Sequence, residues 1–103
     1  MQISWLGYSA FRIQSDGTTI ITDPVDSGVN FKINKQGADI VIASSRETGA
    51  DDAISGKPFA IESAGEYEVR SVFVYGIPAG KQTIYLLVVD DVSIAFLGGV
   101  KLK

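Results

Sequence analysis

Apolar side chains recur at every second position along much of this chain. Ile3 and Trp5 flank a serine, and Phe11 and Ile13 flank an arginine. A period of two is that of a β-strand with one buried face, so we expect these four side chains to point into a core. Gly, Asp and Pro interrupt the apolar segments at short intervals, as they do where a chain turns back between strands.

The pattern predicts a mainly β protein, α+β at most, in which about seven to nine short strands form a mixed or antiparallel sheet. We expect strands over residues 2–5, 11–14, 18–22, 38–43, 58–62, 66–69, 72–78, 83–89 and 92–97. Residues 25–37 read as loop. The polar segment 44–57 has room for one or two short helical turns, the best candidate being residues 50–54. A chain of 103 residues then makes a single domain, residues 1–103.

Composition narrows the chemistry more than the fold. With 46% hydrophobic and 20% charged residues the chain can form a packed core. It has no His and no Cys, which removes the imidazole base, the thiolate nucleophile and the two side chains that hold most zinc ions. We therefore expect no catalytic residues, no cofactor-binding residues and no cofactor.

Charge and hydropathy also limit the partners. Nine Lys and Arg against 12 Asp and Glu give a formal charge of −3, with no basic patch for a phosphate backbone, so no nucleic acid is expected. The longest apolar run, residues 84–89, is far below the ~20 residues that cross a bilayer, so we expect no membrane span. The start has no basic segment before an apolar one, and we expect a cytoplasmic protein.

Several short motifs follow one another in an order that is specific as a set. They are Trp5-Leu6-Gly7-Tyr8-Ser9, Thr22-Asp23-Pro24, Ala38-Asp39-Ile40-Val41, Gly65-Glu66-Tyr67-Glu68-Val69, Gly76-Ile77 and Phe96-Leu97-Gly98. In this order the chain resembles the N-terminal half of small prokaryotic Zn-dependent hydrolases of the metallo-β-lactamase fold. The resemblance implies an αββα sandwich, a dinuclear metal site at its rim, and hydrolysis of a phosphoester, amide or lactone by a metal-bound hydroxide.

The chain departs from that family where the metal ligands would be. The resemblance places Ser45 and Glu47 at two His positions of the ligand loop, Gly49 at its Asp and Ala50 at its last His. Tyr8 and Gly99 likewise replace a His and the bridging Asp. Asp23 is the one family site residue that matches. This pattern indicates a pseudoenzyme without a metal site, and so a structural or protein-interaction module.

Two alternatives stay open. Four carboxylates, Asp23, Glu47, Asp51 and Asp52, could gather at one sheet edge and hold a hard cation such as Mg²⁺ or Ca²⁺, which would make the chain a residual metal-dependent hydrolase with a carboxylate-only site. Otherwise they are solvated loop residues, since their spacing matches no calcium loop. The chain could also be a fragment whose missing half another polypeptide supplies.

A half-domain raises the question of what covers its sheet. In the resembled family each half supplies a sheet that packs on the sheet of the other half, so one half alone would expose an apolar face. The apolar runs at residues 40–42 and 86–89 call for cover on both faces of their strands. We therefore expect a homodimer through the apolar sheet face; no small-molecule ligand is indicated.

Overall fold

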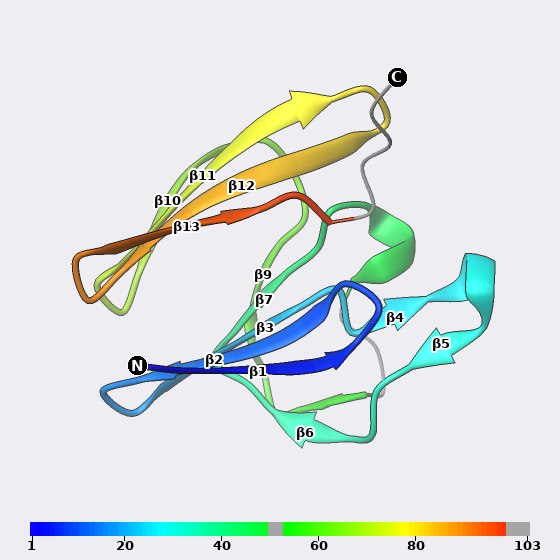
Figure 1. Cartoon of the computed structure of the whole chain (residues 1–103), viewed down its shortest axis with the longest axis horizontal. Helices are drawn as coiled ribbons and strands as arrows, with labels where there is room; N and C mark the ends of the chain where they lie inside the picture. Colours follow the sequence, from blue (N-terminus) through cyan, green and yellow to red (C-terminus); the bar gives the residue numbers. More distant parts are fainter. Residues whose placement is uncertain (50–52, 99–103) are drawn as a thin grey trace.

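Two β-sheets packed face to face make up the computed structural model, which describes residues 1–49 and 53–98 (Figure 1). The five-stranded sheet has the order β1-β2-β3-β7-β9, and the four-stranded sheet the order β10-β11-β12-β13. The strands are β1 (Gln2–Gly7), β2 (Ala10–Ser15), β3 (Thr18–Thr22), β7 (Ile40–Ile42) and β9 (Phe59–Ile61), then β10 (Gly65–Val69), β11 (Val72–Ala79), β12 (Gln82–Val89) and β13 (Val92–Phe96).

Shorter elements join these strands. Two-residue strands pair outside the main sheets, β4 (Val25–Asp26) with β5 (Phe31–Lys32) and β6 (Gln36–Gly37) with β8 (Ile54–Ser55). Two 3-10 turns, η1 (Ser27–Val29) and η2 (Arg46–Thr48), are the only helical elements of the described residues. The mainly β prediction is confirmed, since nine strands have three or more residues. The segment predicted as loop carries β4, β5 and β6, and the helical turn falls on η2; residues 50–52 lie outside the described part.

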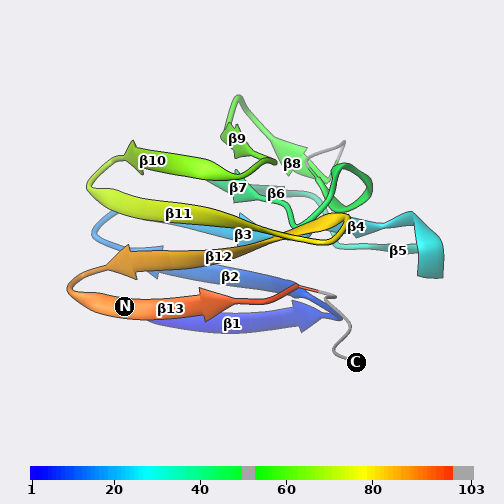
Figure 2. The same cartoon turned by 90° about the horizontal axis from the view of Figure 1, so that it is seen from above.

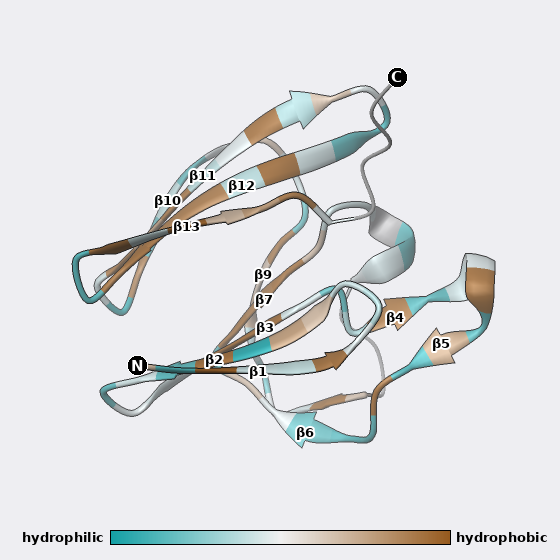
Figure 3. Cartoon of the chain, viewed as in Figure 1, coloured by the Kyte–Doolittle hydropathy of each residue, from teal (hydrophilic) through white to brown (hydrophobic). Residues whose placement is uncertain are grey.

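The inner faces of the two sheets make the main core. Ile13, Ile20, Ile40, Ile42 and Ile61 of the first sheet pack with Val72, Val74, Tyr85, Leu87, Val89 and Phe96 of the second. The chain therefore closes its own sandwich, because β10 to β13 fold back as the second sheet. The reasoning that one chain supplies one sheet and needs a second copy to cover its inner face is wrong. Figure 3 shows hydrophobic positions spread along the strands of both sheets.

A second apolar cluster covers the outer face of the five-stranded sheet. Ile21 and Val41 point outward and are fully buried against Ile33 and Ile54, which belong to the segment between β4 and β8. The run at residues 40–42 is buried throughout, which confirms that β7 is covered on both faces. No helix of the described residues is long and apolar enough to cross a membrane.

Trp5 and Ile3 are not in the core, contrary to the expectation from alternation; Ile3 is 51% exposed. The partner of Trp5 across the strand pair, Phe11, packs against the main cluster, whereas Trp5 is 69% exposed. β1 is the edge of the five-stranded sheet, and β13 lies over it (Figure 2). A cavity lined by Ile3, Phe11 and Ile94 opens between the sheets here, so this edge is not closely packed. Alternation assigns residues to a face but does not tell how closely the opposite sheet packs on it.

Candidate functional site

Three strand ends meet at one rim of the sandwich. β3, β7 and β9 are parallel, so their carboxyl ends lie side by side. Asp23 follows β3, Ala43 and Ser44 follow β7, and Glu62 follows β9. In sheets of this kind the carboxyl ends of parallel strands are a common place for a binding site, and the resemblance places the metal centre here too.

Asp23 is the most buried charged group of this rim. Its side chain is 2% exposed, and both carboxylate oxygens accept hydrogen bonds from Ser44: Oδ1 from the backbone N–H at 2.7 Å and Oδ2 from the Ser44 hydroxyl at 2.8 Å. Burial raises the pKa of the Asp23 carboxyl above its usual range, and the hydrogen bonds from Ser44 and Thr48 oppose that rise. Asp23 is therefore a buried, hydrogen-bonded residue and not a solvated loop residue.

The four-stranded sheet holds Ser44 from its other side. The Thr83 N–H donates to the Ser44 carbonyl at 2.8 Å, and the Tyr85 hydroxyl donates to the Ala43 carbonyl at 2.8 Å. Burial raises the pKa of Tyr85 to about 12, so its hydroxyl keeps the proton that it donates at neutral pH. The network from Asp23 to Tyr85 thus joins the two sheets at the rim.

Gly98 closes this network. Its φ of +59° lies in the left-handed region that favours glycine. A Cβ at this position would lie 2.6 Å from the Ser44 Cβ and 2.7 Å from the Ser44 hydroxyl oxygen, so only a hydrogen fits there. Gly98 belongs to the Phe96-Leu97-Gly98 motif of the resemblance, which would have been the signal for it.

The ligand loop of the family corresponds to a short turn in this chain. Thr48 at the end of η2 donates its hydroxyl to the Ser45 carbonyl at 3.0 Å and accepts from the Ser45 N–H at 3.2 Å. Glu47 is exposed on this turn and Gly49 is buried. Ala50, Asp51, Asp52 and Gly99 lie outside the described residues. The hydrogen bonds between Thr48 and Ser45 therefore stabilise the turn.

A polar cavity of about 540 Å³ opens beside this turn. It is lined by Ser44, Ser45, Glu47, Glu62, Lys81, Gln82 and Thr83. The Oε1 atom of Gln82 is buried there without a hydrogen-bond partner. The cavity mixes acidic, basic and neutral groups, and sequence reasoning identified only Glu47 and Ser45 among its residues.

The donor set does not fit the zinc centre that the resemblance implies. Zinc selects imidazole and thiolate, and the chain has neither. Of the four carboxylates considered, Asp23 is bonded to Ser44 and Glu47 lies on the exposed turn, while Asp51 and Asp52 fall outside the described residues. Within residues 1–49 and 53–98, no three Asp or Glu side chains come together as metal ligands would.

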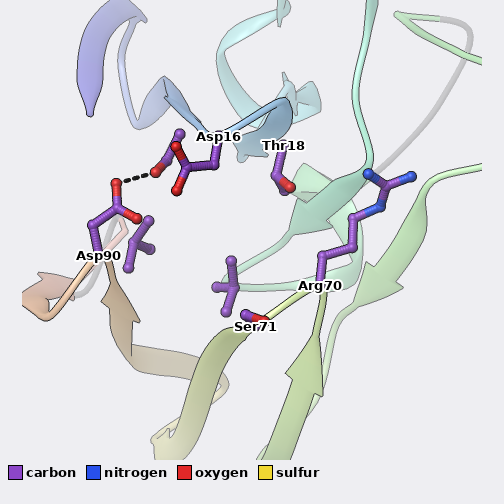
Figure 4. A pocket seen from close by; sticks show the side chains of 8 residues that line it. Asp16, Thr18, Arg70, Ser71 and Asp90 are labelled. Atoms are coloured by element: carbon purple, nitrogen blue, oxygen red, sulfur yellow. Dashed lines mark hydrogen bonds between the residues drawn. The ribbon is translucent and has the colours of Figure 1, made fainter.

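A second cavity lies at the opposite end of the sandwich, between hairpin turns that sequence reasoning did not treat as a site. It measures about 240 Å³, and Asp16, Arg70 and Asp90 are among its lining residues. The Ser15 hydroxyl donates to the Asp90 carboxylate, and Figure 4 shows the Arg70 side chain extending away from the two aspartates. Arg70 instead pairs with Asp39 at 3.5 Å.

Comparison with known proteins identifies the scaffold. The model of the β-lactamase superfamily domain matches residues 2–103. A UPF0173 metal-dependent hydrolase of Methylocella silvestris is 37% identical over 84 residues, which are 79% of this chain and 36% of that protein.

Two solved structures resemble this chain in fold. A protein of Thermotoga maritima, described as a Zn-dependent hydrolase of the metallo-β-lactamase superfamily, superposes with a TM-score of 0.79 at 27% identity, over 93% of this chain and 47% of that one. A metal-dependent hydrolase of Parabacteroides distasonis shares the fold, with a TM-score of 0.63 at 17% identity, over 93% and 59%. The chain thus spans from about a third to somewhat over half of these relatives. On the match of residues 2–103, the chain belongs to the β-lactamase superfamily.

Proposed function

We propose that this chain is a non-catalytic member of its superfamily that acts as a structural or protein-interaction module and forms a homodimer. One observation carries the proposal: at the rim, where the resemblance places the metal centre, both oxygens of Asp23 are bonded to Ser44. A hydrolytic metal site needs three or more ligands and one open position. The relatives described as metal-dependent hydrolases extend well beyond the length of this chain.

In this proposal the two-sheet scaffold provides stability and a surface for a partner, and not catalysis. The rim residues join the two sheets through Thr83 and Tyr85, so they contribute to stability rather than to chemistry. A module of this kind offers a rigid surface to a partner. The cytoplasmic location expected from the sequence stays a prediction.

Isothermal titration calorimetry with Zn²⁺ and with Mn²⁺ tests the proposal. We expect no saturable heat from the chain, because it has no imidazole or thiolate and because residues 1–49 and 53–98 bring no three Asp or Glu side chains together. A variant that combines Ser45→His with Glu47→His is the positive control, since it puts two imidazoles on the turn beside the cavity. A tight isotherm for the unmodified chain, together with metal-dependent hydrolysis of a phosphodiester or a lactone, would instead support the carboxylate-only hydrolase.

A further inference from the structure

The outer face of the four-stranded sheet is an apolar surface that the described part of the chain leaves uncovered. Phe73, Tyr75 and Ile77 of β11 and Leu86 of β12 point away from the core, and each is between 38% and 52% exposed. On β12, Ile84 and Val88 flank Leu86 on the same face and are half-buried. Monomers rarely leave a contiguous apolar patch of several hundred Å² in water, so this face calls for a partner.

The registers of the four strands arrange this face in rows. One row runs across the sheet from Glu66 through Tyr75 and Leu86 to Ala95. The next row runs from Glu68 through Phe73 and Val88 to Ser93. In both rows the β10 margin is acidic, β11 carries an aromatic ring, β12 carries an aliphatic side chain, and the β13 margin is small and uncharged.

This order makes the face complementary to itself. If a second copy is turned about a two-fold axis that runs along the strands between β11 and β12, each row lies over the same row of the partner, reversed. Tyr75 then meets Leu86 of the partner subunit, and Phe73 meets Val88 of the partner subunit. Large rings are thus placed on smaller aliphatic groups, and each acidic margin lies over a neutral one, with Glu68 facing Ser93 of the partner subunit.

The other two-fold arrangement is unfavourable. An axis across the strands would place β10 over β10 of the partner, so Glu66 and Glu68 would meet the same two carboxylates of the second copy. Like charges placed opposite one another oppose association. The distribution of charge on the face therefore selects the axis along the strands.

The area of the face indicates the size class of the contact. Four strands about 4.8 Å apart, five to eight residues long at about 3.4 Å per residue, cover about 400 Å² in projection. Two stacked copies would hide about 800 Å² in projection, and more in accessible surface, against about 1,200–2,000 Å² for stable complexes. The contact belongs to the small, reversible class.

From these observations we infer that a second copy of this chain docks face to face on the outer face of β10 to β13, with the two-fold axis along the strands. The inference rests on the proposed interaction role and names its partner and its surface. Four layers of sheet result, in which the two inner sheets pack as the sheets of a β-sandwich do.

Light scattering on a sizing column, at several protein concentrations, tests the dimer. We expect the mass to rise from 11.0 kDa towards twice that value as the concentration increases. Leu86→Lys puts a charge at the centre of the face and should keep the mass at that of one chain at every concentration. Val29→Lys changes an exposed apolar residue outside this face, 49% exposed against 39% for Leu86, and should behave as the unmodified chain. A circular dichroism spectrum confirms that each variant is folded.

A matched pair at one margin tests the axis. Ser93→Lys should tighten the dimer by about threefold to tenfold, because it would face Glu68 of the partner subunit, and Ser93→Glu should weaken it by a similar factor. Equal effects of the two changes would overturn the arrangement.

A mass of one chain at all concentrations, or a dimer that survives Leu86→Lys, would overturn the docking surface itself. The metal titration reports on the proposed lack of catalysis independently, so the failure of one proposal can be told from the failure of the other.

Discussion

The two ends of the sandwich differ in how the chain is held. At the rim, where β3, β7 and β9 end, Asp23 and Ser44 are buried and satisfied by hydrogen bonds that cross between the sheets. At the opposite end the chain turns back in three two-residue hairpins, and five non-glycine residues there adopt positive φ. The rim is thus fixed by its buried partners, even though Asp23 itself has a φ of +38°, whereas the turns of the hairpin end are exposed and have positive φ without such partners.

The difference lies in how the strand ends are connected. At the rim, where the resemblance places a metal centre, a buried carboxylate and a serine connect the ends of β3 and β7. At the hairpin end no buried network holds the turns, so the positive φ of their residues is not offset by contacts of this kind. Substitutions at the two ends should therefore change stability in opposite directions.

Asp23→Ala should have the largest effect. It leaves the N–H and the hydroxyl of Ser44 buried without their acceptor, and we expect a loss of about 3 kcal/mol in the free energy of unfolding. Urea unfolding measures the loss. Asp26→Ala, on the half-buried neighbouring strand β4, is a matched control and should cost clearly less. Equal losses would show that the rim network adds nothing of its own.

Gly98→Ala comes next, with an expected cost of about 2 kcal/mol, because a methyl group would press on Ser44 and the backbone angle would be strained. Gly17 also has a positive φ, but no atom lies near its missing Cβ. Gly17→Ala therefore carries the strain alone and should cost less. Thermal unfolding of the two variants separates the contact from the strain.

The pH dependence of stability gives a smaller effect with a definite sign. Because burial raises the pKa of Asp23 in the folded chain, the folded state binds this proton more tightly than the unfolded state does. The contribution of Asp23 therefore falls as the pH rises through its folded pKa, and it grows as the pH is lowered. The stability of the unmodified chain relative to Asp23→Asn should increase from pH 7 towards pH 4, as urea unfolding would show. A constant difference would contradict the raised pKa.

The smallest effects lie at the hairpin end, and they are stabilising. Ser71 and Asp91 have φ of +64° and +61° in two-residue turns, where glycine is favoured. Ser71→Gly and Asp91→Gly should each raise the free energy of unfolding by about 0.5–1 kcal/mol. Ser4→Gly, on β1, is the control and should lower it by a similar amount. Loss of stability in the turn variants would mean that the strain is absent.

Much of the fold was predictable because it depends on local alternation. The nine principal strands follow from apolar periodicity and from turn residues, and the burial of β7 on both faces follows from its three consecutive apolar residues. Glu66 and Glu68 point to solvent, and Tyr67 and Val69 pack on the core, as alternation predicts. The burial predicted for Trp5 was wrong because it depends on how closely β13 packs on β1, which alternation does not specify.

The rim was only partly predictable. The Asp-Pro motif pointed to Asp23, but the residues near it in the sequence did not indicate that Ser44 would donate hydrogen bonds to both of its oxygens. Nor did they indicate the hydrogen bond from Tyr85 to Ala43, which lies 42 residues away in the sequence. Such contacts depend on how the sheets stack, which periodicity does not specify. The same holds for the bare outer face of β10 to β13, since a strand pattern does not tell whether a further layer follows.

The parallel pairing of β3, β7 and β9 also has a consequence for the order of folding. β10 to β13 are joined by tight hairpins, so their pairing needs only short loops to close, whereas β3 and β7 must find each other across the intervening β4, β5 and β6. The pairing of β10 to β13 is therefore expected to form early in folding, and the contacts of the rim are expected to form late. Substitutions of Asp23 or Ser44 should then speed unfolding while leaving the rate of folding almost unchanged. The rim would therefore slow the unfolding of the assembled sandwich without affecting how fast it assembles.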